Sequence, residues 1–152
     1  LNYAENLLKT KGPDVALIAH REGSERIELS WDDLREQTAA VSSFLREQGV
    51  QPGQRIAAIM PNVAETVIAV LAVSSIGAVW SSCSPDFGAG GILDRFSQIE
   101  PVWLFAANGY QYNGKQIDST SLVAEVVDGL PRRSPQSMPV LHTLKCDRRD
   151  IQ

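Results

Sequence analysis

Short apolar runs alternate with longer stretches of helical periodicity along this chain. Mostly apolar runs of three to six residues are too short for a buried helix and are typical of buried strands. Such runs occur at residues 15–19, 55–60, 78–80, 102–106 and 140–144. Apolar residues spaced three or four positions apart indicate helices, with such stripes at residues 34–45, 63–76, 92–99 and 122–130. Strand and helix therefore alternate about five times.

This alternation with short loops predicts the α/β class, with a doubly wound and mostly parallel sheet that carries helices on both faces. Nothing marks a closing element after Leu144, so we expect the sheet to be incomplete. The domain organisation that we expect is an N-terminal arm at 1–14, an α/β subdomain at 15–144 and a polar tail at 145–152.

Polar residues at the ends of the apolar stripes predict where the helices begin and end. Ser30 and Asp33 have the spacing of a capping box, and so do Asn62 and Glu65 at the start of the next helix. Gly49 offers a left-handed cap after the first of these helices. Turn residues predict a hairpin that pairs 15–19 with 27–29, and a turn or small hairpin over residues 108–115.

Composition and charge narrow the class of protein. The chain has 152 residues, and its net charge of −4 disfavours a nucleic-acid partner, as does the lack of a basic stripe. Its two cysteines cannot make a disulfide framework, which favours a reducing compartment such as the cytoplasm. The most apolar segment, 67–80, is shorter than the ~20 residues of a membrane span, so we expect no membrane partner.

The stretch from Ser81 to Phe87 is the best candidate for a ligand site. It holds three serines, one cysteine, one proline and one aspartate in seven positions, between a predicted strand and a predicted helix. Ligands of open α/β sheets bind beside loops at the carboxyl ends of strands. The position therefore predicts a ligand site, without naming its ligand.

Two glycine motifs come close to nucleotide-binding patterns and do not complete them. Residues 109–116 resemble a P-loop, but Gln116 stands where the pattern needs Ser or Thr, and the bulky Tyr110 and Tyr112 would hinder a backbone cradle. We interpret this segment as a turn with one cation, Lys115. Residues 88–93 begin like a dinucleotide fingerprint but lack its third glycine, because Leu93 stands there.

The residues near the candidate loop do not assemble a nucleophile or a metal site. A serine or thiol nucleophile needs a base in contact, and the only histidines, His20 and His142, are distant in sequence and lie in strand-like runs. No His and Cys cluster has zinc spacing. We therefore expect no catalytic residues and no metal ligands in this chain.

The run Trp-Ser-Ser-Cys-Ser-Pro-Asp-Phe-Gly at residues 80–88 is the most specific of several runs that carry a family resemblance. Through them the chain resembles the acetoacetyl-CoA synthetases, a family of the acyl-adenylate-forming, AMP-binding ligases. The other matching runs are 1–8, 60–62, 77–79, 93–101 and 112–115. The resemblance extends over about residues 1–131 and is poor after Pro139.

The resemblance implies a reaction and its cofactors. The family activates acetoacetate with ATP and Mg to an acyl-adenylate and pyrophosphate, after which CoA displaces AMP and gives acetoacetyl-CoA. The family's phosphate loop, nucleotide-binding motifs and catalytic lysine all lie downstream of the matched segment. The resemblance therefore implies the N-terminal part of an acetoacetate–CoA ligase, inactive as this fragment. The alternative is a free-standing, non-catalytic α/β binding or regulatory module.

The resemblance also implies which residues contact CoA. In the related acetyl-CoA synthetases the loop that matches Ser84, Pro85 and Asp86 lies beside CoA. The segment that matches Tyr112, Asn113, Gly114 and Lys115 places cations near the nucleotide 3′-phosphate. Tyr112 stands where those relatives have a second arginine, so Lys115 is the cation left for that role.

Overall fold

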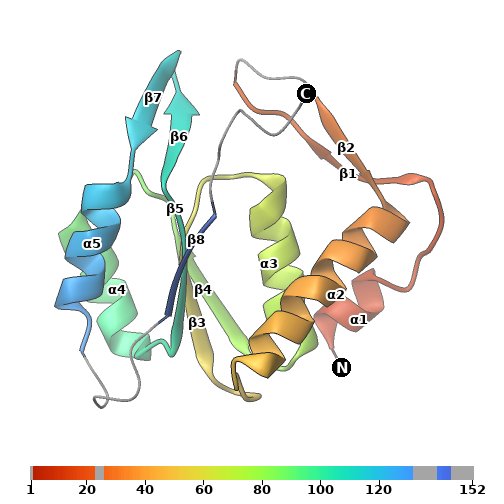
Figure 1. Cartoon of the computed structure of the whole chain (residues 1–152), viewed down its shortest axis with the longest axis horizontal. Coiled ribbons are helices and arrows are strands. Elements are labelled where there is room, and N and C mark those ends of the chain that lie inside the picture. Colours follow the sequence, from red (N-terminus) through yellow and green to blue (C-terminus); the bar gives the residue numbers. More distant parts are fainter. Residues whose placement is uncertain (1, 23–25, 132–139, 145–152) are drawn as a thin grey trace. The chain divides into compact units, whose positions relative to one another are not determined.

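The structure is a computed structural model that describes residues 2–22, 26–131 and 140–144 (Figure 1). The helices are α1 (Tyr3–Leu7), α2 (Trp31–Glu47), α3 (Ala64–Ser75), α4 (Ala89–Ile99) and α5 (Thr120–Gly129). The strands are β1 (Val15–Ala19), β2 (Ile27–Ser30), β3 (Arg55–Ile59), β4 (Val79–Cys83), β5 (Trp103–Ala107), β6 (Gly109–Tyr112), β7 (Lys115–Asp118) and β8 (Val140–Leu144). The polar tail predicted at 145–152 lies outside the described residues.

The described residues form two compact units. The first comprises residues up to 54 together with 62–80, and the second comprises 55–61 and the described residues from 81 onward. No helix in these described parts is both long and apolar enough to cross a membrane.

The first unit packs three helices with an antiparallel hairpin. Strands β1 and β2 pair in the predicted hairpin, in a register that sets Ala19 opposite Ile27. One core cluster of this unit comes from α1, α2 and α3, and partly buried residues of the hairpin pack against it. Its buried cluster is Ala4, Leu34, Ile68 and Leu71. The predicted stripe on α2 is confirmed, since Leu34, Thr38 and Leu45 are buried.

Of the two predicted caps at helix N-termini, one is confirmed and the other is wrong. Ser30 caps α2, and its capping box with Asp33 is complete. Asn62 does not cap α3, because the residue at the cap position is Val63, in an extended conformation and without a side-chain hydrogen bond. The helix begins two residues after Asn62, and the Glu65 carboxylate pairs with the Arg21 guanidinium instead of turning back to the backbone.

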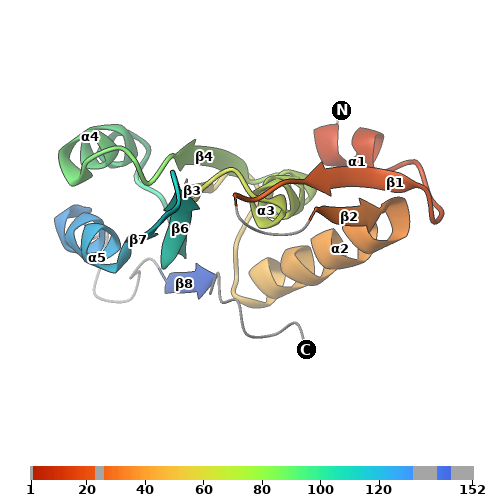
Figure 2. The ribbon, with the colours of Figure 1, turned by 90° about the horizontal axis from the view of Figure 1, so that it is seen from above.

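The second unit is built on a four-stranded sheet in the order β4-β3-β5-β8. β5 pairs in parallel with both β3 and β8. Helices α4 and α5 cover one face of this sheet (Figures 1 and 2) and pack there in one core cluster. Ile92 and Phe96 of α4 and Val126 of α5 are fully buried in it. A parallel sheet flanked by helices confirms the predicted α/β class.

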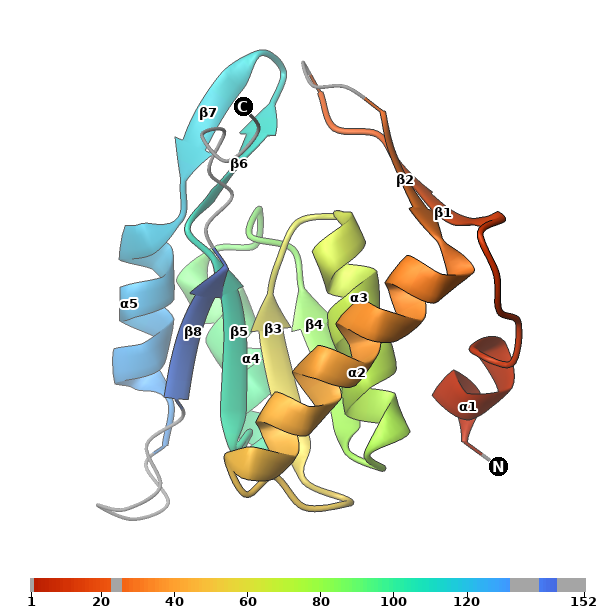
Figure 3. The same cartoon turned by 45° about the vertical axis from the view of Figure 1, so that its right-hand side comes forward.

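The hairpin of β6 and β7 follows β5 directly and extends beyond the carboxyl end of that strand (Figure 3). Asn113 and Gly114 form its turn with positive φ angles of 50° and 72°. Two successive positive φ angles are the signature of the tight hairpin turns that match strand twist. The predicted hairpin is therefore confirmed.

Candidate functional site

The candidate loop begins three residues later than its polar side chains predict. We expected the loop from Ser81, but β4 runs on to Cys83. Side chains alternate along this part of the strand, with Ser82 exposed and Cys83 buried in the core of the second unit. The Cys83 carbonyl accepts a hydrogen bond from the Met60 backbone N–H at 3.3 Å, so the backbone is paired although the side chains are small and polar.

Ser84 and Asp86 close the loop into a compact turn. The Ser84 hydroxyl donates to Asp86 Oδ2 at 2.8 Å and accepts from the Asp86 backbone N–H at 3.3 Å. The Phe87 backbone N–H donates to the Ser84 carbonyl at 3.1 Å. Pro85 is buried between them, while the Asp86 carboxylate is exposed. The loop therefore presents an acceptor group on a locally fixed backbone.

Tyr110 joins this loop to the hairpin. Its hydroxyl, on β6, donates a hydrogen bond to Asp86 Oδ1. The pKa of the Asp86 carboxyl lies below its ordinary value, chiefly because of this bond and secondly because of the bond from the Ser84 hydroxyl. The same bond to a carboxylate raises the pKa of Tyr110 to about 12. The loop that holds Ser84, Pro85 and Asp86 thus meets the hairpin through Tyr110, which lies just before the predicted site segment 112–115.

The hairpin register places Lys115 on the same face as Tyr110. Tyr112 lies directly opposite Lys115, and such opposed residues in antiparallel strands carry their side chains on one face. Tyr110 precedes Tyr112 by two residues and shares that face, about 7 Å further along the strand. Tyr112 is 64% exposed, and Lys115 is exposed as well. This hairpin face carries an aromatic pair, with Ile117 opposite Tyr110 and one cation, Lys115, at its turn end.

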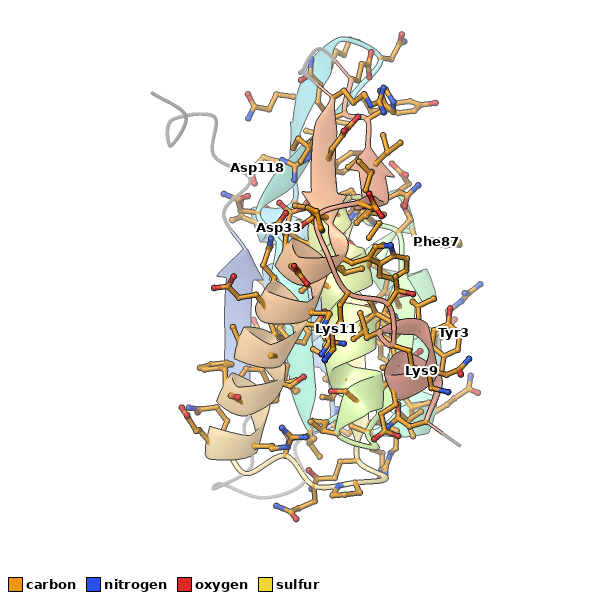
Figure 4. The ribbon with its side chains drawn as sticks, turned by 90° about the vertical axis from the view of Figure 1, so that its right-hand side faces the viewer. Tyr3, Lys9, Lys11, Asp33, Phe87 and Asp118 are labelled. Atoms are coloured by element: carbon orange, nitrogen blue, oxygen red, sulfur yellow. The ribbon has the colours of Figure 1, made fainter. Side chains whose placement is uncertain are left out.

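Phe87 and Arg95 flank the loop where it leads into α4. The Arg95 guanidinium carbon lies 4.9 Å above the centre of the Phe87 ring, within the range of a cation–π contact. Phe87 is exposed and labelled in Figure 4. α4 begins at Ala89 after Gly88, which takes the cap position without a side-chain bond. The exposed Arg95 guanidinium therefore covers the ring at the end of the loop.

The segment that resembles a P-loop, residues 109–116, does not have the P-loop conformation. A P-loop connects a strand to a helix, whereas residues 109–116 form a hairpin in which Gly109 makes a close backbone approach. A Cβ atom at Gly109 would lie 2.5 Å from the Ile117 carbonyl oxygen. That glycine therefore serves strand packing rather than phosphate binding.

The two histidines lie in or beside strands of different sheets. His142 lies in β8, and His20 directly follows β1. Among residues 2–22, 26–131 and 140–144, no group of three or more His, Cys, Asp or Glu could hold a metal ion. A hollow of about 240 Å³ exists in the first unit, lined mainly by α2 residues, and it contains none of the predicted site residues.

Comparisons with known proteins match this chain to one family and to relatives of one kind. The family described as AMP-binding enzyme matches residues 5–151. The acetoacetyl-CoA synthetase of Mus musculus is 49% identical over 133 residues, which cover 86% of this chain and 20% of the relative. The acetoacetyl-coenzyme A synthetase of Rhizobium meliloti is 48% identical over 130 residues, with the same two coverages of 86% and 20%.

A solved structure gives the same result for the fold. The acetoacetyl-CoA synthetase from Streptomyces lividans superimposes with a TM-score of 0.84 at 39% identity, over 95% of this chain and 24% of that protein. The chain thus spans about a fifth to a quarter of the length of the relatives that it matches.

Proposed function

Because the chain belongs to the AMP-binding enzyme family, we propose that it is the CoA-contacting α/β segment of an acetoacetate–CoA ligase. The identity of nearly half of the aligned residues to acetoacetyl-CoA synthetases supports the acid substrate. The meeting of the Ser84–Asp86 loop with the hairpin face of Lys115 supports the CoA contact.

The proposed reaction has two steps. A carboxylate oxygen of acetoacetate attacks the α-phosphorus of ATP, and the bond to pyrophosphate breaks. The CoA thiolate then attacks the acyl carbonyl carbon, and the bond to AMP breaks to give acetoacetyl-CoA. The residues of this chain contribute to the second step by holding CoA in place, which spares the thiol the entropy cost of finding the acyl-adenylate.

The chemistry of the hairpin face fits CoA. Lys115 is an exposed ammonium, which binds phosphate as a point charge. Tyr112 offers an exposed ring for stacking, and aromatic rings stack on bases regardless of their identity. Asp86, an acceptor, suits an N–H or O–H donor of the cofactor better than a phosphate. Asn113 and Gly114 complete the turn beside Lys115.

ATP and Mg²⁺ are assigned no contact with the described residues. The near-P-loop at residues 109–116 is a hairpin, and no described group of side chains can hold a metal. In this proposal both bind elsewhere in the ligase, and the 152-residue chain alone has no ligase activity. The proposed compartment is the cytoplasm, and the proposed partners are acetoacetate and CoA rather than nucleic acid or a membrane.

The test is an assay of a ligase that contains this segment beside the segment alone. The ligase is expected to release pyrophosphate with ATP and acetoacetate and to release AMP only when CoA is added. Acetate at the same concentration serves as the control acid. Pyrophosphate release by the 152-residue chain alone would contradict the proposal that ATP binds elsewhere in the ligase and that this chain alone has no activity. A reading frame that ends at Gln152 in the cell would favour the non-catalytic binding module instead.

A further inference from the structure

We infer that Tyr110 is a positioning residue of this CoA site: its phenol holds Asp86, and with it the loop of residues 84–88, against the hairpin face that carries Lys115. The inference rests on the proposed function, since it concerns how that CoA site is held together. Its structural basis is the hydrogen bond from the Tyr110 hydroxyl to Asp86 Oδ1.

Tyr110 supplies a link between the loop and the hairpin. The side-chain hydrogen bonds of Ser84 and Asp86 are local, within the turn, apart from the one that Asp86 accepts from Tyr110. Residues 86 and 110 are 24 positions apart in sequence: Asp86 lies in the loop after β4, and Tyr110 is a half-buried residue of β6. A hydrogen bond to a charged group is about twice as strong as a neutral one, so this link restrains the loop more than an ordinary polar contact would.

The bond also changes what Asp86 offers to a ligand. Ser84 donates to one carboxylate oxygen and Tyr110 donates to the other. Each oxygen keeps a free lone-pair site, so the carboxylate can still accept a hydrogen bond from CoA. The two donors draw off part of its negative charge, which lowers the repulsion between Asp86 and the phosphates that approach Lys115. The donors in CoA are its amide N–H, amine and hydroxyl groups, and these are the groups expected at Asp86.

The main experiment measures steady-state kinetics of the ligase that contains this segment, with Tyr110→Phe as the test variant. Tyr110→Phe removes only the hydroxyl and is expected to raise KM for CoA about tenfold, the effect of losing one hydrogen bond to a charged group. KM for ATP, KM for acetoacetate and kcat are expected to change by less than about twofold. Tyr3→Phe is the matched control, because Tyr3 is an exposed tyrosine on α1, in the first unit (Figure 4).

A second measurement tests the bond without CoA. The tyrosine ionisation signal that disappears in Tyr110→Phe reports Tyr110, whose raised pKa of about 12 leaves it mostly protonated at pH 11. Asp86→Asn removes the carboxylate that is the largest cause of this shift, while burial and Tyr112 still raise the pKa of Tyr110, so the ionised fraction at pH 11 is expected to rise severalfold from about 10%. An unchanged fraction in Asp86→Asn would overturn the inference whatever CoA does.

A failure of the positioning role of Tyr110 can be distinguished from a failure of the proposed CoA site. If Lys115→Ala raises KM for CoA and Tyr110→Phe does not, the CoA site stands and the positioning role is wrong. If neither variant changes KM for CoA while the ionisation of Tyr110 depends on Asp86, the contact is structural and the proposed CoA site is wrong. A rise in all three KM values with Tyr110→Phe would also overturn the positioning role, because it would indicate a general loss of structure.

Discussion

The Asp33 carboxylate accepts a hydrogen bond from the Ser30 backbone N–H at 2.9 Å, while the Ser30 hydroxyl accepts one from the Asp33 backbone N–H at 3.1 Å. These reciprocal bonds satisfy two groups at the start of α2 that the helix itself leaves without partners. The carboxylate lies at the positive end of the helix dipole, and its hydrogen bonds with Ser30 lower the pKa of Asp33.

Ser30→Ala is expected to lower the free energy of unfolding by about 1 kcal/mol, the usual cost of removing a cap side chain. Urea denaturation followed by circular dichroism measures the change. The control is Asn62→Ala, which should cost less because Asn62 does not occupy the cap position of α3. An equal loss in both variants would contradict the assignment of the two helix starts.

The contrast between Ser30 and Asn62 shows how far sequence reasoning reaches at helix ends. Both positions carry a cap residue with an acidic residue three positions later. Only the structure shows that Glu65 has a competing partner, Arg21, which lies 44 residues away in sequence. A local pattern predicts a cap when no distant charge draws its members away.

Local patterns also decide which parts of the candidate site the sequence predicts and which it does not. The strand, the loop and the hairpin follow from local patterns, and the hairpin turn at Asn113 and Gly114 needs nothing from the rest of the chain. The sequence marks Tyr110 only as a bulky residue that would hinder the backbone cradle of a P-loop. The available signal was its spacing of two from Tyr112, which places both on one face of a strand. Its bond to Asp86 spans a helix and a strand, so no local pattern could predict it.

The Asp86–Tyr110 bond is expected to stabilise the fold in a bounded pH range. The pKa of Asp86 is lowered from 3.8, so its contribution is present above that value and is lost as pH falls through the lowered pKa. The pKa of Tyr110 is raised from 10.0 to about 12, so its contribution is full below pH 10 and is lost as pH rises through about 12. The urea midpoint of the unsubstituted chain should exceed that of Tyr110→Phe most clearly near pH 7. A gap that does not shrink below pH 3 or above pH 11 would contradict this assignment.

Gly109→Ala is expected to destabilise the hairpin, because the new Cβ atom would lie 2.5 Å from the Ile117 carbonyl oxygen, a backbone atom. Overpacking of this kind costs about 1–3 kcal/mol. Gly91→Ala is the opposite case: Gly91 is an exposed residue of α4 with open space at its Cβ position. Alanine there should stabilise by about 0.5–1 kcal/mol. Thermal unfolding of both variants measures the difference, and a stabilising Gly109→Ala would contradict the strand register.

The most direct test of the proposed CoA site compares CoA with dephospho-CoA, which lacks the 3′-phosphate. In a ligase that contains this segment, KM for dephospho-CoA is expected to exceed KM for CoA by about 2- to 5-fold, the contribution of one exposed ion pair. Lys115→Ala should bring this ratio to about 1 by raising KM for CoA alone. Lys11→Ala, which removes an exposed lysine of the first unit (Figure 4), should leave the ratio unchanged. A ratio that survives Lys115→Ala would contradict the proposal that this hairpin binds the 3′-phosphate of CoA.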